Sequence, residues 1–274
     1  MPTSMRAGGA APGTAPAGEA VLWFCMRANI LLPAGAALLA ASGLACAAET
    51  SWRDIESRIQ YGYYTEDAAA LRSLRGLIAA DESHDRLHGY YAALLAWREA
   101  QLAAQGVPAS RGQPAGDLAQ RCVTEADHVL EAQAAFADVL ALRAACLATP
   151  LGASGGAISA RAARKDIERA LKSAPRDPRA LLVDGMNDYQ LTSSGGSKER
   201  ALGKLRIAVA AFESERAGVE RLPGWGAAEA YLFLARDLLD HADPVGARDA
   251  LEHALLIAPE YAQARRFMAR IIGG

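Results

Sequence analysis

The sequence has few aromatic residues and no stretch in which β-branched residues alternate with polar ones. Aromatic residues make up 6% of the 274 positions, whereas hydrophobic residues make up 51%, and alanine is the commonest of them. Strands are typically rich in β-branched and aromatic residues, while alanine favours helices that pack closely. The composition therefore excludes a β-sandwich and predicts an all-α protein with a sizeable core.

The chain also lacks an excess of charge of either sign. Its formal net charge is −2, and its basic residues occur singly or in pairs such as Arg265-Arg266. A nucleic-acid-binding surface needs clustered basic residues, and a charged disordered tail needs a long run of one sign. We therefore expect no nucleic-acid partner.

Catalytic and metal-binding motifs are missing from the sequence as well. His84 and His88 have a spacing that suits two metal ligands on one helix, but no third ligand accompanies them. The segment 194–198 does not match the phosphate-binding loop Gly-x-x-x-x-Gly-Lys-[Ser/Thr], so a flexible turn with Ser197 as the N-cap is the simpler interpretation. We predict no catalytic residues, no metal and no cofactor, and a protein that is not an enzyme.

The N-terminal region has the pattern of an export signal. Residues 1–25 are rich in Gly, Ala and Pro and are predicted to be an extension outside the fold, with Met26 as the true start. Residues 26–48 contain Arg27, then an uncharged apolar run and the small residues that typically precede a signal-peptidase cleavage site. We predict a signal peptide at 26–48, a periplasmic or secreted protein and no stable membrane span after cleavage.

Two alternatives for this region stay open. Cys46 would carry a lipid if the protein were a lipoprotein, although the lipobox-like context is out of step by one residue. The apolar run would also serve as an uncleaved anchor, but it is barely long enough to span a bilayer and Pro33, Gly35 and Gly43 interrupt it.

Cys122 and Cys146 are the cysteines that follow the signal peptide. If their two helices form a hairpin that turns near Gln133, the cysteines lie at similar heights, and an exported protein can hold a disulfide. Small buried thiols are nevertheless the commoner outcome in an alanine-rich core. We expect the two cysteines not to be bridged.

Helical spacing recurs along residues 49–274. The helix that follows Asp243-Pro244 places small and apolar residues at Ala247, Leu251 and Ala254 and stops before Pro259. The same offsets of 4, 3 and 5 separate Ala163, Ile167, Ala170 and Pro175. This second occurrence indicates a repeat.

The spacing resembles the tetratricopeptide repeat (TPR), a helix-turn-helix unit of about 34 residues. The resemblance is weak over residues 49–131 and stronger over 132–274, and Tyr231 stands where the motif usually has Trp. The order of Asp177-Pro178, Gly185 and residues 223–226 is also similar to exported bacterial TPR proteins of unassigned activity. The resemblance implies an α-solenoid of about five helical pairs with a capping helix after Pro259.

Such a solenoid implies a concave surface lined by the first helix of each pair. The residues expected in this binding groove are Arg179, Met186, Tyr189, Leu232 and Arg236. Two Gly-rich insertions, at 149–159 and 192–198, join first to second helices of adjacent pairs, so they are expected to meet at one edge through Gly155, Gly156, Gly195 and Gly196.

These features predict a non-catalytic scaffold in the bacterial cell envelope that binds a segment of an unknown partner protein in its groove. The alternative is a small-molecule binding protein that uses the two Gly-rich loops.

Overall fold

The computed structural model describes residues 51–80, 86–108, 112, 114–149, 156–216 and 222–273. The chain divides into two units, residues 1–48 and residues 49–274, and every described residue belongs to the second unit. The predicted extension, the signal peptide with Cys46, and Met26 therefore lie outside the described residues. None of the helices in the described residues is both long and apolar enough to cross a membrane.

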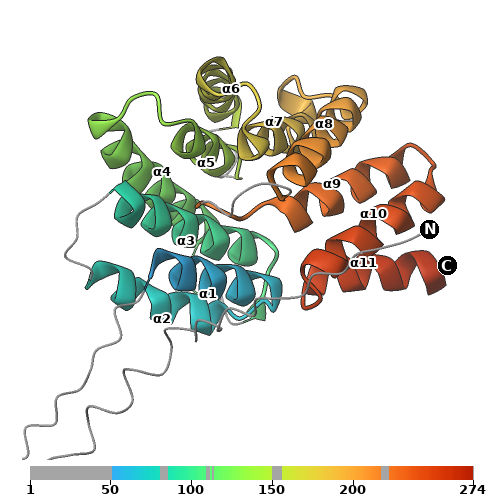
Figure 1. Cartoon of the computed structure of the whole chain (residues 1–274), viewed down its shortest axis with the longest axis horizontal. Coiled ribbons are helices and arrows are strands. Elements are labelled where there is room, and N and C mark those ends of the chain that lie inside the picture. The colour runs from blue at the N-terminus through green and yellow to red at the C-terminus, as the bar shows by residue number, and fades with distance from the viewer. Residues whose placement is uncertain are drawn as a thin grey trace, which may run out of the picture. The chain divides into compact units, whose positions relative to one another are not determined.

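The described residues form α-helices and short 3-10 segments, and no strand occurs among them (Figure 1). The elements are α1 (Trp52–Tyr64), α2 (Ala68–Ala79), α3 (Arg86–Ala104), α4 (Ala115–Ala132), α5 (Ala137–Ala148), α6 (Gly156–Ser173), α7 (Pro178–Gln190), η2 (Thr192–Ser194), α8 (Lys198–Arg216), α9 (Ala227–Asp240), α10 (Pro244–Ile257) and α11 (Ala262–Gly273).

Short polar residues start several of these helices. Asp177 and Asp243 each accept a hydrogen bond from a backbone N–H of the first turn, at 2.7 and 2.9 Å, and a proline follows each of them at the first helical position. A carboxylate cap satisfies a free N–H, and proline suits this position because its missing N–H is not needed there. Ser51 caps α1 in the same way, and Ser197 caps α8, as predicted for Ser197.

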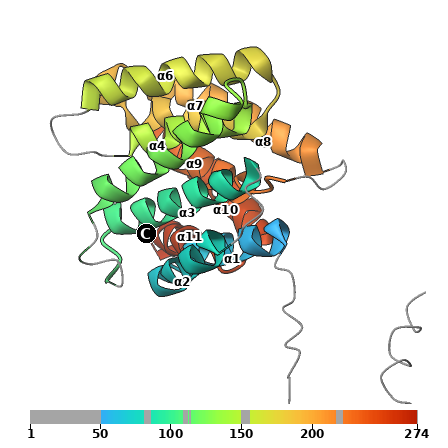
Figure 2. The ribbon, with the colours of Figure 1, turned by 90° about the vertical axis from the view of Figure 1, so that its left-hand side faces the viewer.

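Consecutive helices pack as pairs. The pairs are α1 with α2, α3 with α4, α5 with α6, α7 with α8, and α9 with α10. Each pair also packs on the next, because α1 contacts α3, α4 contacts α5, α5 contacts α7, and α8 contacts α9, while α11 covers α10 (Figures 1 and 2). The all-α prediction of about five stacked pairs and a capping helix is confirmed.

Small residues allow the helices of a pair to approach closely. A Cβ added at Gly185 of α7 would lie 2.9 Å from the side chain of Leu205 in α8, closer than a real Cβ contact. Ala235 and Ala247 are fully buried between α9 and α10. Larger side chains at these positions would hold the helices apart.

The prediction that Cys122 and Cys146 are not bridged is wrong. They form a disulfide that joins α4 to α5, with their Cα atoms 6.2 Å apart. The hairpin turns at Gln133, as expected, and this turn brings both fully buried cysteines to the same height. The sequence could not decide the point, because two helix faces must also be turned toward each other.

Candidate functional site

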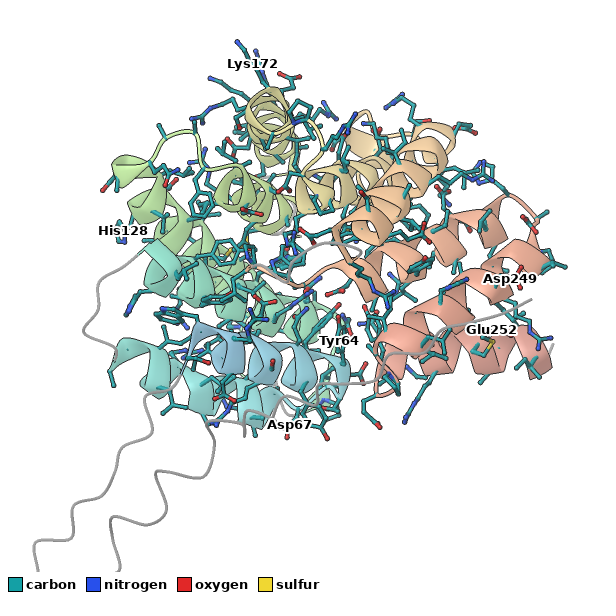
Figure 3. All side chains as sticks on the ribbon, in the orientation of Figure 1. Tyr64, Asp67, His128, Lys172, Asp249 and Glu252 are labelled. Atoms are coloured by element: carbon teal, nitrogen blue, oxygen red, sulfur yellow. A yellow bond between two sulfur atoms is a disulfide. The ribbon has the colours of Figure 1, made fainter. Side chains whose placement is uncertain are left out.

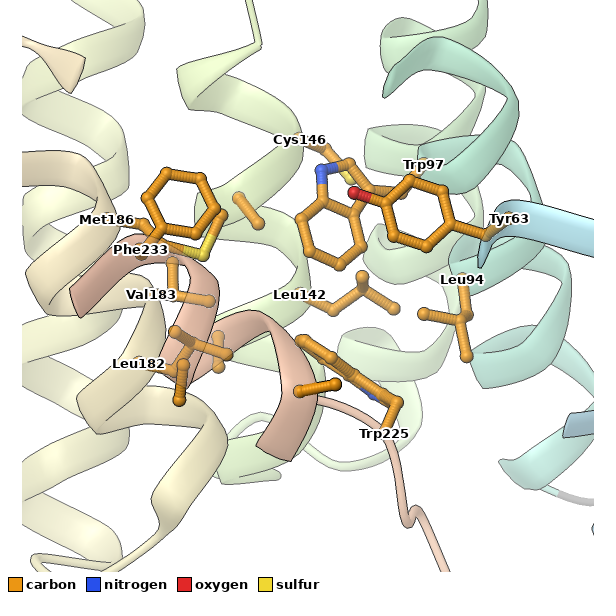
Figure 4. Packing of buried hydrophobic residues seen from close by; sticks show 14 of the residues in the cluster. Tyr63, Leu94, Trp97, Leu142, Cys146, Leu182, Val183, Met186, Trp225 and Phe233 are labelled. Atoms are coloured by element: carbon orange, nitrogen blue, oxygen red, sulfur yellow. The ribbon is translucent and has the colours of Figure 1, made fainter. Parts of the chain in front are cut away.

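The odd-numbered helices share one face of the stack, which we call the inner face. Figure 4 shows buried side chains from α1, α3, α5, α7 and α9 gathered there, among them Tyr63, Trp97, Leu142, Met186 and Phe233. These residues are distant in sequence and belong to one continuous hydrophobic cluster. The inner face is thus the surface that the repeat pattern predicted as a groove.

Side chains of the first pairs reach those of the last pair and α11 across the inner face. We call these contacts the seam. They join Tyr64 to Glu229 at 2.9 Å, Tyr63 to Tyr261 at 3.3 Å, and Trp225 Nε1 to the hydroxyl of Tyr90 at 2.6 Å. Figure 3 labels Tyr64 on α1, beside the C-terminal helices. The seam closes the middle of the predicted groove with the protein's own side chains.

Arg98 of α3 lies at the centre of the seam and is fully buried. Its guanidinium donates to the carboxylate of Glu229, which is also buried. It lies 4.1 Å from the ring centroid of Tyr63, 4.5 Å from that of Trp97 and 5.2 Å from that of Trp225. A desolvated guanidinium is stabilised by such aromatic faces and by its carboxylate partner.

A pocket of about 370 Å³ opens on one side of Arg98, and we call it the amide pocket. Trp97, Met186 and Phe233 form its apolar floor, and each is at most 4% exposed. Neutral amide side chains contribute most of the polar residues of its lining: Gln101, Gln105, Asn187, Gln190 and Gln263. The pocket therefore offers an apolar surface together with hydrogen-bond donors and acceptors that carry no net charge.

Arg236 is the charged residue among those that line the amide pocket. Its guanidinium donates to Gln263 at 2.8 Å and lies 5.0 Å from the ring centroid of Phe233. Arg236 forms no ion pair within the described part of the chain, and no Asp or Glu is among the described residues that line the pocket. A cationic group would therefore find no counter-charge there.

A second pocket, of about 470 Å³, lies on the other side of Arg98. Its charged lining includes Arg53, Glu56, Glu215 and Arg216. The carboxylate of Glu56 accepts hydrogen bonds from Tyr91 at 2.5 Å and from the Gly224 N–H at 2.7 Å. Burial raises the pKa of Glu56 above its ordinary value, although these two hydrogen bonds oppose the shift.

The residues predicted for the groove do not all lie in one place. Met186 and Arg236 line the amide pocket. Tyr189 packs on Phe233 and donates to Asp240 at 2.9 Å, outside the lining. Leu232 is fully buried, and buried Arg179 forms an ion pair at 2.9 Å with Glu215 of the second pocket. The structure thus brings together Met186 and Arg236, and it places Arg179 and Leu232 in the interior.

The two Gly-rich segments lie between α5 and α6 and between α7 and α8, but they are shorter than the predicted 149–159 and 192–198, because α6 begins at Gly156 and α8 at Lys198. Gly155 lies outside the described residues, and Gly156 is the first residue of α6. Gly195 has a positive φ of 91° and packs against Arg164 of α6, which donates to the Ser194 carbonyl. Gly196 sits so close to the Asp188 carbonyl that a Cβ would overlap it.

A pocket of about 390 Å³ lies beside Gly195. Two of the basic residues there already have a carboxylate partner, because Asp188 pairs with Arg200 at 3.0 Å and with Lys204 at 2.7 Å, whereas Arg164 donates to a backbone carbonyl. The hydrogen bonds from Arg200 and Lys204 outweigh partial burial and lower the pKa of Asp188.

The described residues contain no group of three or more His, Cys, Asp or Glu side chains that could hold a metal ion. His88 packs edge-on against Trp52, at 6.1 Å between ring centroids, and His84 lies outside the described residues.

Sequence reasoning missed the seam and the amide side chains that line the amide pocket, which we call the amide rim. Arg98 and Glu229 are 131 positions apart and give no local signal. The glutamines at 101, 105, 190 and 263 look like ordinary solvated residues of amphipathic helices. These residues come together only because the helices stack side by side. The repeat pattern implies this stacking but does not determine which residues of neighbouring helices lie next to each other.

Comparison with known proteins supports the fold. No family model and no curated protein matches the chain. Among solved structures, the chain is similar to the crystal structure of a thermophilic TPR protein from Thermus thermophilus, with a TM-score of 0.54 and 15% identity over 81% of this chain and 99% of that chain. The structure is therefore that of a TPR-like helical repeat protein.

Proposed function

We propose that this chain is an exported scaffold of the bacterial cell envelope that binds a segment of a partner protein and carries out no covalent chemistry. The amide pocket is the observation that supports this most directly, because six odd-numbered helices contribute to one concave, partly apolar lining. Concave sites with an apolar surface and a few placed polar groups are where proteins bind ligands and peptides.

Export is supported by two independent features. The segment 26–48 has the pattern of a signal peptide. The disulfide between Cys122 and Cys146 is a bond that persists in oxidising compartments such as the periplasm and is rare in the cytosol.

Photo-cross-linking from the rim of the amide pocket tests the scaffold. A benzoylphenylalanine at Gln190, which is exposed and lines the pocket, should cross-link a partner in cells of the source organism. The matched control places the same residue at Arg206, an exposed position of α8 that lines no described pocket. A partner captured from Gln190 and not from Arg206, which then binds the purified chain, supports the proposal. Equal labelling from both positions contradicts it.

The pocket beside Gly195 favours a second candidate function, a small-molecule binding protein. Its lining joins Arg164 of α6 to the loop between α7 and α8. Thermal stabilisation of the chain by a low-molecular-weight cell extract, lost in Arg164→Gln, would support this function over the scaffold.

A further inference from the structure

The amide pocket is closed at the end that faces Arg98, and we call such a pocket blind. Arg98 separates it from the second pocket, because its Nη1 donates at 2.9 Å to Gln101 of the amide pocket and its Nε donates at 3.1 Å to Gln60 of the second pocket. The rings of Tyr63, Trp97 and Trp225 surround the same guanidinium. An extended segment therefore cannot run along the inner face from one pocket into the other, and an occupant must enter and leave by the same side.

The size of the amide pocket limits that occupant. A volume of about 370 Å³ is at the small end of the range of ligand pockets, which is about 300–1,000 Å³. Buried Trp97, Met186 and Phe233 supply the large apolar side chains of its lining. Such a floor is suited to one large apolar side chain, since an aromatic ring buries much area with little loss of conformational freedom.

The lining also specifies the charge of the occupant. Arg236 has no carboxylate partner in the described part of the chain, so a second cation in the pocket would be repelled and left desolvated. The partial negative charge at the C-terminal ends of α3, α5 and α7, which meet here, offsets part of the positive charge of Arg236. The electrostatic environment of the pocket therefore suits an uncharged segment best.

One buried donor in the lining has an unmet hydrogen bond. Asn187 lies between the amide pocket and the pocket beside Gly195 and lines both; it is 6% exposed, and its Nδ2 has no hydrogen-bond partner among the described residues. A buried amide without a partner is uncommon, and a peptide carbonyl supplies the acceptor that it lacks.

We infer that the amide pocket anchors one large apolar side chain, presented by an uncharged segment of a partner protein whose backbone hydrogen-bonds the amide rim. This inference rests on the proposed function and specifies the chemistry of the partner. The anchor enters from the rim at Gln105 and Gln190 and ends against Trp97, short of Arg98.

Methionine-methyl NMR of the full chain tests the inference. Met186 lies in the pocket floor, and Met268 of α11 lines none of the described pockets, so one sample contains both a reporter and an internal control. The probes are acetyl-Gln-Trp-Gln-amide, acetyl-Gln-Ala-Gln-amide and acetyl-Lys-Trp-Lys-amide. We expect the first to shift the Met186 signal, the second to leave it unchanged and the third to bind several-fold more weakly, while Met268 stays fixed. The methyl signal that is lost in Met186→Leu is assigned to Met186.

A matched pair of substitutions locates the binding. Ala104→Trp fills the pocket from an exposed rim position and should abolish the shift, whereas Ala210→Trp, on the exposed surface of α8, should preserve it. Equal shifts with the Trp and Ala peptides, tighter binding of the Lys peptide, or no effect of Ala104→Trp would overturn the inference. If Gln190 cross-links a partner but no peptide shifts Met186, the inference fails and the scaffold stands. If peptides bind here and no partner is captured, the scaffold fails instead.

Discussion

Arg98 shows how one side chain both stabilises the fold and shapes the site. A buried guanidinium is costly unless its charge is paired and its donors are occupied. Glu229, Gln60 and Gln101 occupy its donors. Because Gln101 also lines the amide pocket, the network that satisfies Arg98 also fixes part of the lining of this candidate site.

Two carboxyl groups three positions apart on α9 have opposite pKa shifts. Asp237 is fully buried, neither of its oxygens has a hydrogen bond in the described part of the chain, and burial raises its pKa above 3.8. His241 Nδ1 lies 3.3 Å from Oδ1. Asp240 pairs at 2.8 Å with Lys198, and this hydrogen bond lowers its pKa. The two positions therefore form a matched pair for a pH experiment.

We predict that Asp237→Asn and Asp240→Asn change thermal stability with opposite dependence on pH. When folding raises the pKa of a carboxyl group, the contribution of that group to stability is complete below the pKa of the unfolded chain. This contribution is lost as pH rises through the pKa of the folded protein. The Tm of Asp237→Asn relative to the wild type should therefore increase as pH rises above about 4.

When folding lowers the pKa of a carboxyl group, the ionised group stabilises the protein at pH values above the pKa of the unfolded chain. This contribution is lost as pH falls through the pKa of the folded protein. Asp240→Asn should therefore lower Tm at neutral pH and approach the wild type in acid. Calorimetry at several pH values measures both, and a Tm difference for Asp237→Asn that does not change with pH would contradict the assignment.

At the scale of elements, the disulfide fixes α4, which lies at the end of the weaker part of the repeat pattern, to α5. The bonded cysteines are 24 positions apart. Closing a loop of this length reduces the entropy of the unfolded chain and stabilises the fold by about 3 kcal/mol. We predict that Cys122→Ala/Cys146→Ala lowers the free energy of unfolding in urea by about this amount.

Reduction of the wild type serves as the control for this prediction. The reduced wild type should unfold at a urea concentration close to that of the double variant. If thiol titration of the unreduced, denatured protein finds Cys122 and Cys146 free, the bridge is absent and the prediction fails.

Most elements were predictable from the sequence because their signals are local. Asp177-Pro178 and Asp243-Pro244 mark helix starts by hydrogen-bond chemistry, and Pro259 marks an end. The repeat offsets then gave the pairing of helices. The site was predictable only in part: Met186 and Arg236 follow from the rule that first helices line the inner face, whereas the burial of Arg179 depends on Glu215, 36 positions away.

The seam distinguishes the described unit from an ideal open repeat array. In such an array each repeat contacts only its neighbours, so a local change has local effects. Here the first and last helices are linked through side chains, because Tyr261 contacts both Tyr63 and Tyr64, at ring-centroid distances of 5.8 and 4.6 Å. Arg266 of α11 also pairs with Glu66. The stability of α1 should therefore depend on residues at the other end of the chain.

We predict that Tyr261→Ala increases hydrogen exchange in α1 as well as in α10 and α11. The substitution removes the aromatic contacts of Tyr261 with α1 and its hydroxyl contact with Tyr63. Leu251→Ala is the control, since Leu251 is fully buried in α10 and makes no described side-chain hydrogen bond or ring contact with α1. Hydrogen-exchange mass spectrometry should show faster exchange in α1 for Tyr261→Ala, and a change confined to the C-terminal helices for Leu251→Ala. If both variants affect only α10 and α11, the seam does not couple the two ends of the chain. The side chains of the seam would then not be held firmly enough to close one end of the amide pocket.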